Sequence, residues 1–193
     1  MITRLFRTLA PAICAIPLTG DHCPVIPALG WYSGLSYLAF LRHPGCPFAE
    51  QTIKLLRQQA ASMPEVRFVA ILHGDGAAAE SWLAEIGGAG SAVLIFDESG
   101  TLYAQWGLGF TGAGHFLGLS ALLGLLALLR YGIRNRAASG TRWQRAGSFV
   151  INSSGVLLWK HLPVSAQDVP QPAAVLAPFI AARGANTAAP DRL

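Results

Sequence analysis

Short apolar runs alternate with helix-spaced apolar positions along the middle of the chain. A run rich in aliphatic and aromatic residues, bounded by glycine, proline or polar residues, is typical of a buried strand. Three such runs occupy residues 35–41, 66–72 and 92–96. Between them, apolar side chains recur every three or four positions, which predicts one helix from Pro47 to just before Pro64 and another over residues 77–86. This alternation of strands and helices is typical of a sheet with parallel strands.

The carboxyl-terminal third adds a hairpin and a helix. The apolar segments 147–152 and 156–161 flank a Ser-Ser-Gly turn, which indicates two antiparallel strands. A last helix is predicted from about Pro172 to residue 182, with Pro178 inside it. Together these elements predict an α/β fold in which a mixed central sheet carries helices on both faces.

Length and composition fit a single globular domain. The chain has 193 residues, and domains usually contain roughly 100–200. Hydrophobic residues make up 52% and charged residues 12% of the sequence, a balance that excludes a disordered chain. The net charge of +4 is too small to indicate a nucleic-acid partner. We expect an irregular amino-terminal arm, one domain and a loose tail, over residues 1–29, 30–183 and 184–193.

The amino-terminal arm carries a weak targeting pattern. Arg4 and Arg7 precede a short apolar stretch that two prolines interrupt. A secretory signal would also need a small-x-small cleavage site, and none is convincing here. We therefore expect a cytoplasmic protein and leave a cleaved targeting segment as the alternative.

Residues 116–129 form an uncharged, leucine-rich run that predicts a helix. The run is shorter than the about 20 residues that a membrane span needs. We favour a helix packed on the sheet or in a homodimer interface. Arginines follow it at positions 130, 134, 136, 142 and 145. Because such a cluster suits an anionic membrane surface, an interfacial membrane helix remains as the less favoured alternative.

The segment around Cys46 carries the strongest chemical signal. Cys46 lies between the strand over 35–41 and the helix that begins at Pro47, which predicts that it caps this helix at the carboxyl edge of the sheet. There, free backbone N–H groups and the helix dipole favour a reachable thiolate over the thiol. Arg42 would strengthen this preference and hold an anionic substrate oxygen, and His43 would act as a base.

Each of these residues also has an ordinary structural interpretation. A single cysteine is often a small buried hydrophobe. Arg42 could simply end a strand, and His43 could lie on the surface. The three together at the start of a helix favour a functional site. The remaining histidines and cysteines, including Asp21-His22-Cys23, have no second cluster with ligand spacing, so we expect neither a metal nor a cofactor.

The sequence around the thiol resembles a known family. Gly45-Cys46-Pro47-Phe48, placed after a strand and opening a helix, is similar to the thioredoxin-fold group of alkyl hydroperoxide reductases and thiol-specific antioxidant proteins (AhpC/TSA), above all to its peroxiredoxin-like branch. Further segments resemble that branch in the same order: Phe96-Asp97, residues 102–109, Trp143-Gln144, and residues 147–151 followed by Gly155. The resemblance covers nearly the whole chain and implies a thioredoxin-like three-layer sandwich.

The resemblance also implies an activity. The Cys46 thiolate would attack a peroxide and become a sulfenic acid, which a thiol reductant would reduce. Cys46, Arg42 and His43 would be the catalytic residues of a thiol peroxidase. Cys14 or Cys23 could resolve the sulfenic acid, although we favour both as spectators. The alternative is a non-catalytic thioredoxin-like module with an inert Cys46, which acts in oligomer or membrane-surface association through its leucine-rich helix.

Several positions depart from the family's pattern. His43 stands where peroxiredoxins carry a threonine. Ala49 stands where a Cys-x-x-Cys pair would place its second cysteine, so a local disulfide is impossible. The arginine that the family carries before the hairpin falls at Ala146, with Arg145 one position away. Because neighbouring strand residues point to opposite faces, Arg145 does not simply replace it.

Overall fold

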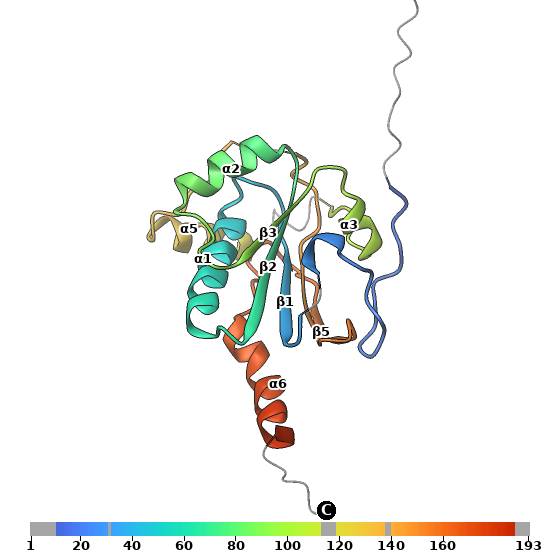
Figure 1. Cartoon of the computed structure of the whole chain (residues 1–193). Coiled ribbons are helices and arrows are strands. Elements are labelled where there is room, and N and C mark those ends of the chain that lie inside the picture. Colours follow the sequence, from blue (N-terminus) through green and yellow to red (C-terminus); the bar gives the residue numbers. More distant parts are fainter. Residues whose placement is uncertain (1–10, 31, 113–118, 138–139, 188–193) are drawn as a thin grey trace, which may run out of the picture.

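The structure is a computed structural model that describes residues 11–30, 32–112, 119–137 and 140–187 (Figure 1). Strands and helices alternate along the chain in the predicted order. The elements are the 3₁₀ helix η1 (Pro27–Leu29), β1 (Leu35–Phe40), α1 (Pro47–Ser62), β2 (Val66–His73), α2 (Gly76–Glu85), β3 (Val93–Asp97), α3 (Thr101–Gln105), α5 (Leu119–Leu129), β4 (Gly147–Ile151), β5 (Leu157–His161) and α6 (Pro172–Thr187).

Five strands form one mixed sheet in the order β3-β2-β1-β4-β5. β1 pairs in parallel with β2, and β2 pairs in parallel with β3. β4 runs antiparallel to both β1 and β5, so the second half of the sheet is the predicted hairpin. The prediction of an α/β fold with a mixed sheet is confirmed. The carboxyl ends of the three parallel strands share one edge, where open α/β sheets usually place their sites.

Helices cover both faces of the sheet, as predicted, and each face has its own apolar core (Figure 1). On one face, the helices contribute side chains such as Ile53 of α1, Leu128 of α5 and Leu176 of α6. On the other face, α3 and the amino-terminal arm pack against the sheet through residues such as Tyr103 and Ile26. The sheet between two covered faces forms the expected three-layer arrangement.

The described part of the amino-terminal arm lies along the hairpin. The N–H of Gly20 donates to the carbonyl of Leu157 over 2.8 Å, and the N–H of Cys23 donates to the carbonyl of Gly155 over 2.9 Å. These backbone bonds fix the arm against the sheet without forming a strand. Residues 1–10 lie outside the described residues, so the targeting segment and the cytoplasmic location remain predictions.

Two helices differ from the sequence prediction at their ends. α5 is described from Leu119, and residues 116–118 of the predicted run lie outside the described residues. α6 continues to Thr187 and so enters the segment expected to be a loose tail. The reason is that a single glycine, here Gly184, costs a helix only about 1 kcal/mol and does not by itself end it. No described helix is both long and apolar enough to cross a lipid bilayer.

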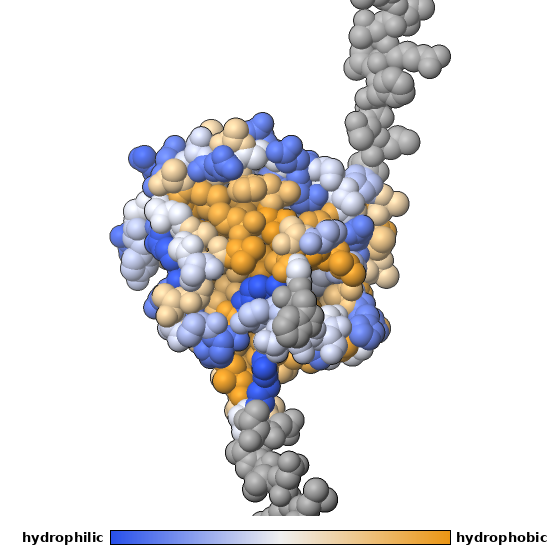
Figure 2. Space-filling view, viewed as in Figure 1, coloured by the Kyte–Doolittle hydropathy of each residue, from blue (hydrophilic) through white to orange (hydrophobic). Residues whose placement is uncertain are grey.

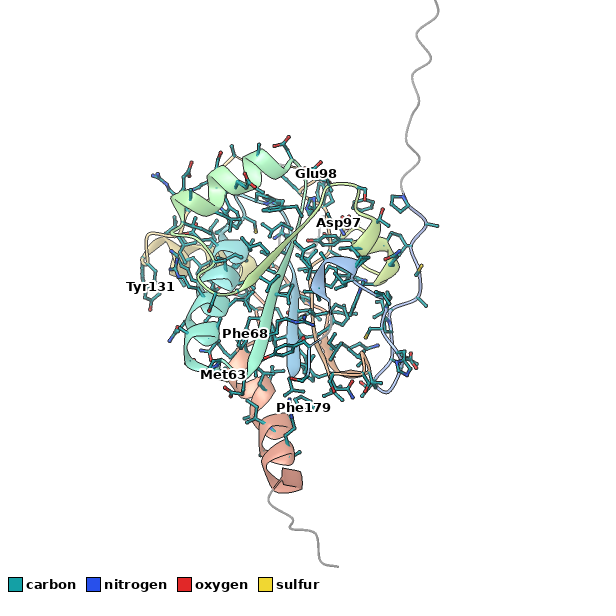
Figure 3. The ribbon with its side chains drawn as sticks, in the orientation of Figure 1. Met63, Phe68, Asp97, Glu98, Tyr131 and Phe179 are labelled. Carbon is teal, nitrogen blue, oxygen red and sulfur yellow. The ribbon has the colours of Figure 1, made fainter. Side chains whose placement is uncertain are left out.

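Apolar side chains reach the surface at the edge strand β3. Figure 2 shows them gathered over this strand, where Val93 is exposed and Leu94 and Phe96 are partly buried against the core. At the amino ends of β1 and β2, Phe179 of α6 packs against the same core (Figure 3). α6 therefore lies at the sheet edge opposite the one that carries Cys46.

Candidate active site

Cys46 begins helix α1, as the sequence predicted. Its backbone is extended, with φ of −73° and ψ of 129°, and Pro47 occupies the first helical turn. The N–H of Cys46 donates to the carbonyl of His43 over 3.1 Å, and the carbonyl of Cys46 accepts the N–H of Glu50 over 3.0 Å. The preceding Gly45 makes the turn out of β1 with φ of 91°, a conformation that residues with a side chain rarely adopt.

The Cys46 side chain is buried, which corrects the expectation of a reachable thiolate. Cys46 is 2% exposed and belongs to the apolar core on the α1 face of the sheet. Arg42 and His43 are buried as well, so His43 is not a surface residue. The structure thus brings the three predicted site residues together, but in the interior rather than at an open rim.

A segment that follows α5 lies against the turn that precedes Cys46. We call these residues, 133–137, the cover segment. The N–H of Arg136 donates to the carbonyl of Gly45 over 2.9 Å. A Cβ atom on Gly45 would collide with the carbonyl of Ala137, so the two backbones are in close contact. Ile133 joins the same apolar core as Cys46.

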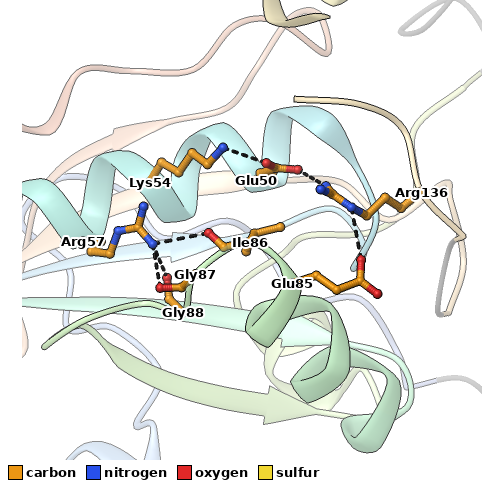
Figure 4. Close-up of polar contacts among 8 residues, drawn as sticks. All are labelled: Glu50, Lys54, Arg57, Glu85, Ile86, Gly87, Gly88 and Arg136. Atoms are coloured by element: carbon orange, nitrogen blue, oxygen red, sulfur yellow. Dashed lines mark hydrogen bonds and ion pairs between the residues drawn. The ribbon is translucent and has the colours of Figure 1, made fainter. Parts of the chain in front are cut away.

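Ion pairs fasten the cover segment to α1 and α2 (Figure 4). The guanidinium of Arg136 pairs with the carboxylate of Glu50, whose side chain is 2% exposed. Nε of Arg136 also lies 3.2 Å from Oε2 of Glu85. Nζ of Lys54 approaches the other Glu50 oxygen at 2.8 Å. The sequence analysis did not select Glu50 and Arg136 as site residues. The four-residue spacing of Glu50 and Lys54 indicates an ion pair within the helix, but nothing in the sequence connects Glu50 to Arg136.

The side chain of Arg42 is buried. Burial lowers the pKa of its guanidinium, and Cys46 opposes this pKa shift. Nη2 of Arg42 donates to the carbonyl of Arg142 over 3.3 Å. Arg42 also lines a pocket of about 30 Å³, which has room for a water-sized molecule. Ala146 lines this pocket too, whereas Arg145 is not among its described lining residues.

His43 is buried in its neutral form. Its Nδ1 lies 2.9 Å from the carbonyl oxygen of Pro44, and Nδ1 carries the proton because a carbonyl oxygen only accepts. Burial lowers the pKa of His43, and the hydrogen bond to Pro44 partly opposes this pKa shift. The positive charges of Arg42 and Arg142 lower the pKa further. Nε2 is therefore left as a proton acceptor, which is the state that a general base needs.

His73 belongs to the same region, although sequence reasoning did not select it. It ends β2 at the carboxyl edge and is buried. Burial lowers the pKa of His73 to about 4, and a backbone hydrogen bond with Arg42 opposes this pKa shift only in part. Within the described part of the chain, its Nε2 has no hydrogen-bond partner. Its position at the end of the second parallel strand was the one signal that could have indicated it.

Tyr103 joins the two strands that end at the site. Its buried hydroxyl donates to the carbonyls of Leu41 and Ile71 over 2.7 and 2.8 Å. Its ring meets the His73 ring edge-on, with the centroids 5.5 Å apart. Because Tyr103 comes from the opposite face of the sheet, α3 and the parallel strands together hold this edge of the site.

Neither of the other two cysteines lies beside Cys46. The N–H of Cys14 donates to a carbonyl of α3 over 2.9 Å, on the opposite face of the sheet from Cys46. Cys23 bonds to Gly155 in the hairpin turn, at the opposite edge of the sheet. Burial, with a smaller effect of Asp21, raises the pKa of Cys23 to about 11. All three cysteines are free thiols.

Comparison with protein families identifies a family to which the chain belongs. The model of the AhpC/TSA antioxidant enzyme family matches residues 53–163, more than half of the chain. The matched region begins inside α1, so Arg42, His43 and Cys46 precede it. The match therefore carries no information about these three residues. No curated protein matches the sequence.

Solved structures share the fold at low sequence identity. The chain is similar to a cysteine-to-serine mutant of peroxiredoxin 6 from Arenicola marina, with a TM-score of 0.62 and 14% identity over 92% of this chain and 80% of that chain. A peroxiredoxin-like protein from Aquifex aeolicus gives a TM-score of 0.59 and 13% identity, over 88% of this chain and 90% of that chain. A thiol peroxidase from Chromobacterium violaceum gives a TM-score of 0.58 and 12% identity, over 90% of this chain and 92% of that chain. These similarities establish the thioredoxin-like fold alone.

Proposed function

Because the chain belongs to the AhpC/TSA antioxidant enzyme family, we propose that it reduces a peroxide through the sulfur atom of Cys46. The observation that carries this proposal is the position of Cys46 at the start of α1, with the buried Arg42 and His43 in the turn that precedes it. Free N–H groups at a helix start and a nearby cation both stabilise negative charge on sulfur. The thiolate is the form of cysteine that attacks a peroxide.

The proposed reaction moves one proton and two electrons among named groups. Nε2 of His43 accepts the thiol proton of Cys46, and the sulfur then attacks the terminal peroxide oxygen. A sulfur–oxygen bond forms and the oxygen–oxygen bond breaks, which leaves a sulfenic acid on Cys46. The departing oxygen takes the proton back from His43 and leaves as an alcohol or water. The guanidinium of Arg42 stabilises the negative charge that develops on this oxygen.

An external thiol completes the proposed cycle. Ala49 removes the local partner, and Cys14 and Cys23 lie on another face or edge of the sheet. The first thiol therefore condenses with the Cys46 sulfenic acid to a mixed disulfide and water. A second thiol then cleaves this disulfide and restores the Cys46 thiol.

Access to the sulfur requires the cover segment to move. Cys46 is buried, and the residues that line the small pocket beside Arg42 do not include it. Residues 133–137 are held by one backbone hydrogen bond to Gly45, by the ion pairs of Arg136 with α1 and α2, and by Ile133 in the core. Such contacts can open locally without unfolding the domain. Opening of this segment is therefore part of the proposed function.

The burial of Cys46 is also the observation that favours the second candidate, a non-catalytic thioredoxin-like module. Cysteines sealed in an apolar core are usually inert. In that case, the cover segment would be a permanent part of the core, and the leucine-rich α5 would serve association only. The two candidates differ in whether peroxide ever oxidises Cys46.

The decisive experiment measures peroxide consumption and the site of oxidation in the full chain. We expect Cys46→Ser to abolish the consumption of hydrogen peroxide in the presence of dithiothreitol. Cys14→Ser and Cys23→Ser serve as matched controls and should keep the wild-type rate. A sulfenic-acid trap followed by mass spectrometry should label Cys46 in the wild-type protein. Retained turnover in Cys46→Ser, or an unlabelled Cys46 after a peroxide pulse, would exclude the proposed mechanism.

A second variant tests the proposed role of Arg42. Arg42→Gln removes the positive charge and keeps a hydrogen-bond donor of similar reach. We expect it to slow the reaction of Cys46 with peroxide by roughly 10²–10³-fold, the range typical for loss of one stabilising charge in a transition state. The exposed Arg130 gives a matched control, and Arg130→Gln should leave this rate unchanged.

A further inference from the structure

Helix α5 leaves an apolar face uncovered. Leu128 anchors the helix in the core, whereas Leu123, Leu126 and Leu129 are 57%, 51% and 48% exposed. These three leucines follow one another at three-residue spacing, so they form one continuous stripe on the helix surface. Isolated exposed leucines are ordinary, whereas exposed leucines gathered on one helix face are typical of an interaction surface.

The residues that follow α5 add an aromatic ring and positive charge to this stripe. Tyr131 is 79% exposed and points away from the body of the molecule (Figure 3). Arg130 and Arg134 are exposed beside it. The sequence contains no aspartate or glutamate between Glu98 and Asp168, so Arg130 and Arg134 have no acidic neighbour close in sequence.

We infer that α5 docks onto the surface of an anionic lipid bilayer. The exposed leucines would enter the boundary between headgroups and acyl chains, and Arg130 and Arg134 would contact anionic headgroups. Tyr131 has the amphipathic ring that is typical of membrane interfaces. At 11 described residues, α5 is too short to cross the bilayer and would lie in its surface. This inference does not depend on peroxide chemistry at Cys46.

Charge argues for lipid and against a second copy of the chain. A contact between two copies through the leucine stripe would cover the leucines but would supply no opposite charge to Arg130 and Arg134, because the segment 99–167 contains no carboxylates. An anionic bilayer covers the leucines and also supplies the opposite charge to these two arginines. The charge pattern and the apolar stripe therefore point to the same partner.

The test is flotation of the full chain with lipid vesicles. We expect the protein to float with vesicles of phosphatidylcholine and phosphatidylglycerol and to remain largely unbound with phosphatidylcholine alone. The variant Arg130→Gln/Arg134→Gln should bind the anionic vesicles about 30-fold more weakly. Replacement of Leu123, Leu126 and Leu129 by Gln should weaken binding by at least about 100-fold.

Matched variants separate docking from general effects. Val25→Gln/Val164→Gln alters two exposed apolar residues elsewhere and should bind like the wild type. Cys46→Ser should also bind like the wild type, because vesicle binding requires no reaction at the thiol. Circular dichroism serves to check that each variant is folded. The two arginine substitutions lie on the surface, so they are the ones least expected to disturb folding.

Three outcomes would overturn the inference. The first is a wild-type chain that does not float with anionic vesicles. The second is equal binding to neutral and anionic vesicles, or unchanged binding of either the leucine or the arginine variant. The third is a dimer, seen by size-exclusion chromatography with light scattering, that the leucine variant dissociates while no vesicle binding occurs. The last result would assign α5 to a second copy of the chain.

Discussion

The guanidinium of Arg136 forms an ion pair with the buried carboxylate of Glu50, one helical turn after Cys46. This pair joins the cover segment to the helix that carries the thiol. The backbone bond from Arg136 to Gly45 makes a second connection at the same place. We therefore expect Arg136 to link the stability of this region to the accessibility of the sulfur.

We expect Arg136→Gln to increase the reactivity of Cys46. The substitution removes the ion pairs to Glu50 and Glu85, so residues 133–137 should open more often. In a Cys14→Ser/Cys23→Ser background, alkylation of Cys46 by iodoacetamide should become at least about tenfold faster, which corresponds to about 1.4 kcal/mol of easier opening.

The same substitution should lower the free energy of unfolding by about 1–3 kcal/mol. It leaves the buried Glu50 carboxylate with Lys54 as its remaining described ion-pair partner. Arg134→Gln, in the same segment but exposed, is the control for both measurements. An alkylation rate that does not change in Arg136→Gln would show that the cover segment does not limit access.

Gly45→Ala tests the close contact between the turn and the cover segment. A positive φ costs an alanine roughly 1–2 kcal/mol, and collision with the carbonyl of Ala137 should add about 1–3 kcal/mol. Gly88 has a φ of 73°, and a Cβ atom added there would meet no neighbouring atom. Gly88→Ala should therefore show only the cost of the positive φ. Chemical denaturation measures both variants, and equal destabilisation would contradict the contact.

Stability should fall in mild acid because His73 is buried in its neutral form. The pKa of His73 is lowered from 6.5 to about 4, so between these values the unfolded chain binds more protons than the folded one. The free energy of unfolding should therefore drop by up to about 3 kcal/mol as the pH falls from about 7 to about 4. Above about pH 7 this contribution is fully present.

His73→Phe should flatten this pH dependence while it keeps an aromatic ring against Tyr103. Some dependence of the free energy of unfolding on pH should remain, because the pKa of His43 is lowered as well. Denaturant unfolding at several pH values gives the measurement, and His22→Gln, at an exposed position, is the control. A His73→Phe profile identical to the wild type would show that His73 takes up its proton as readily in the folded state as in the unfolded chain.

Tyr103→Phe should destabilise the protein by about 1–3 kcal/mol. The substitution removes a buried hydroxyl that donates to the carbonyls of Leu41 and Ile71. The Ile71 carbonyl keeps the N–H of Leu41 as a donor, so the larger loss falls on the Leu41 carbonyl. Tyr131→Phe removes a hydroxyl from an exposed ring and should change the free energy of unfolding by less than about 0.5 kcal/mol. Thermal and denaturant unfolding should agree on this difference.

The order of elements around the thiol could be predicted because it depends on neighbouring residues. Apolar runs mark β1 and β2, and Pro47 marks the first turn of α1. The cap position of Cys46 follows from these local signals. The end of α6 was predicted less well, since Gly184 looks like a stop in sequence but the helix tolerates it.

The local pattern of this chain was enough to determine the α/β fold, the start of α1 and the sulfur placed there, because capping and periodicity act between residues close in sequence. Only the tertiary structure decided that residues 133–137 return to Gly45, that Arg136 meets Glu50, and that His73 lies near Arg42. Those contacts join segments far apart in the chain, and their energy arises only when the packed sheet and helices bring the segments together.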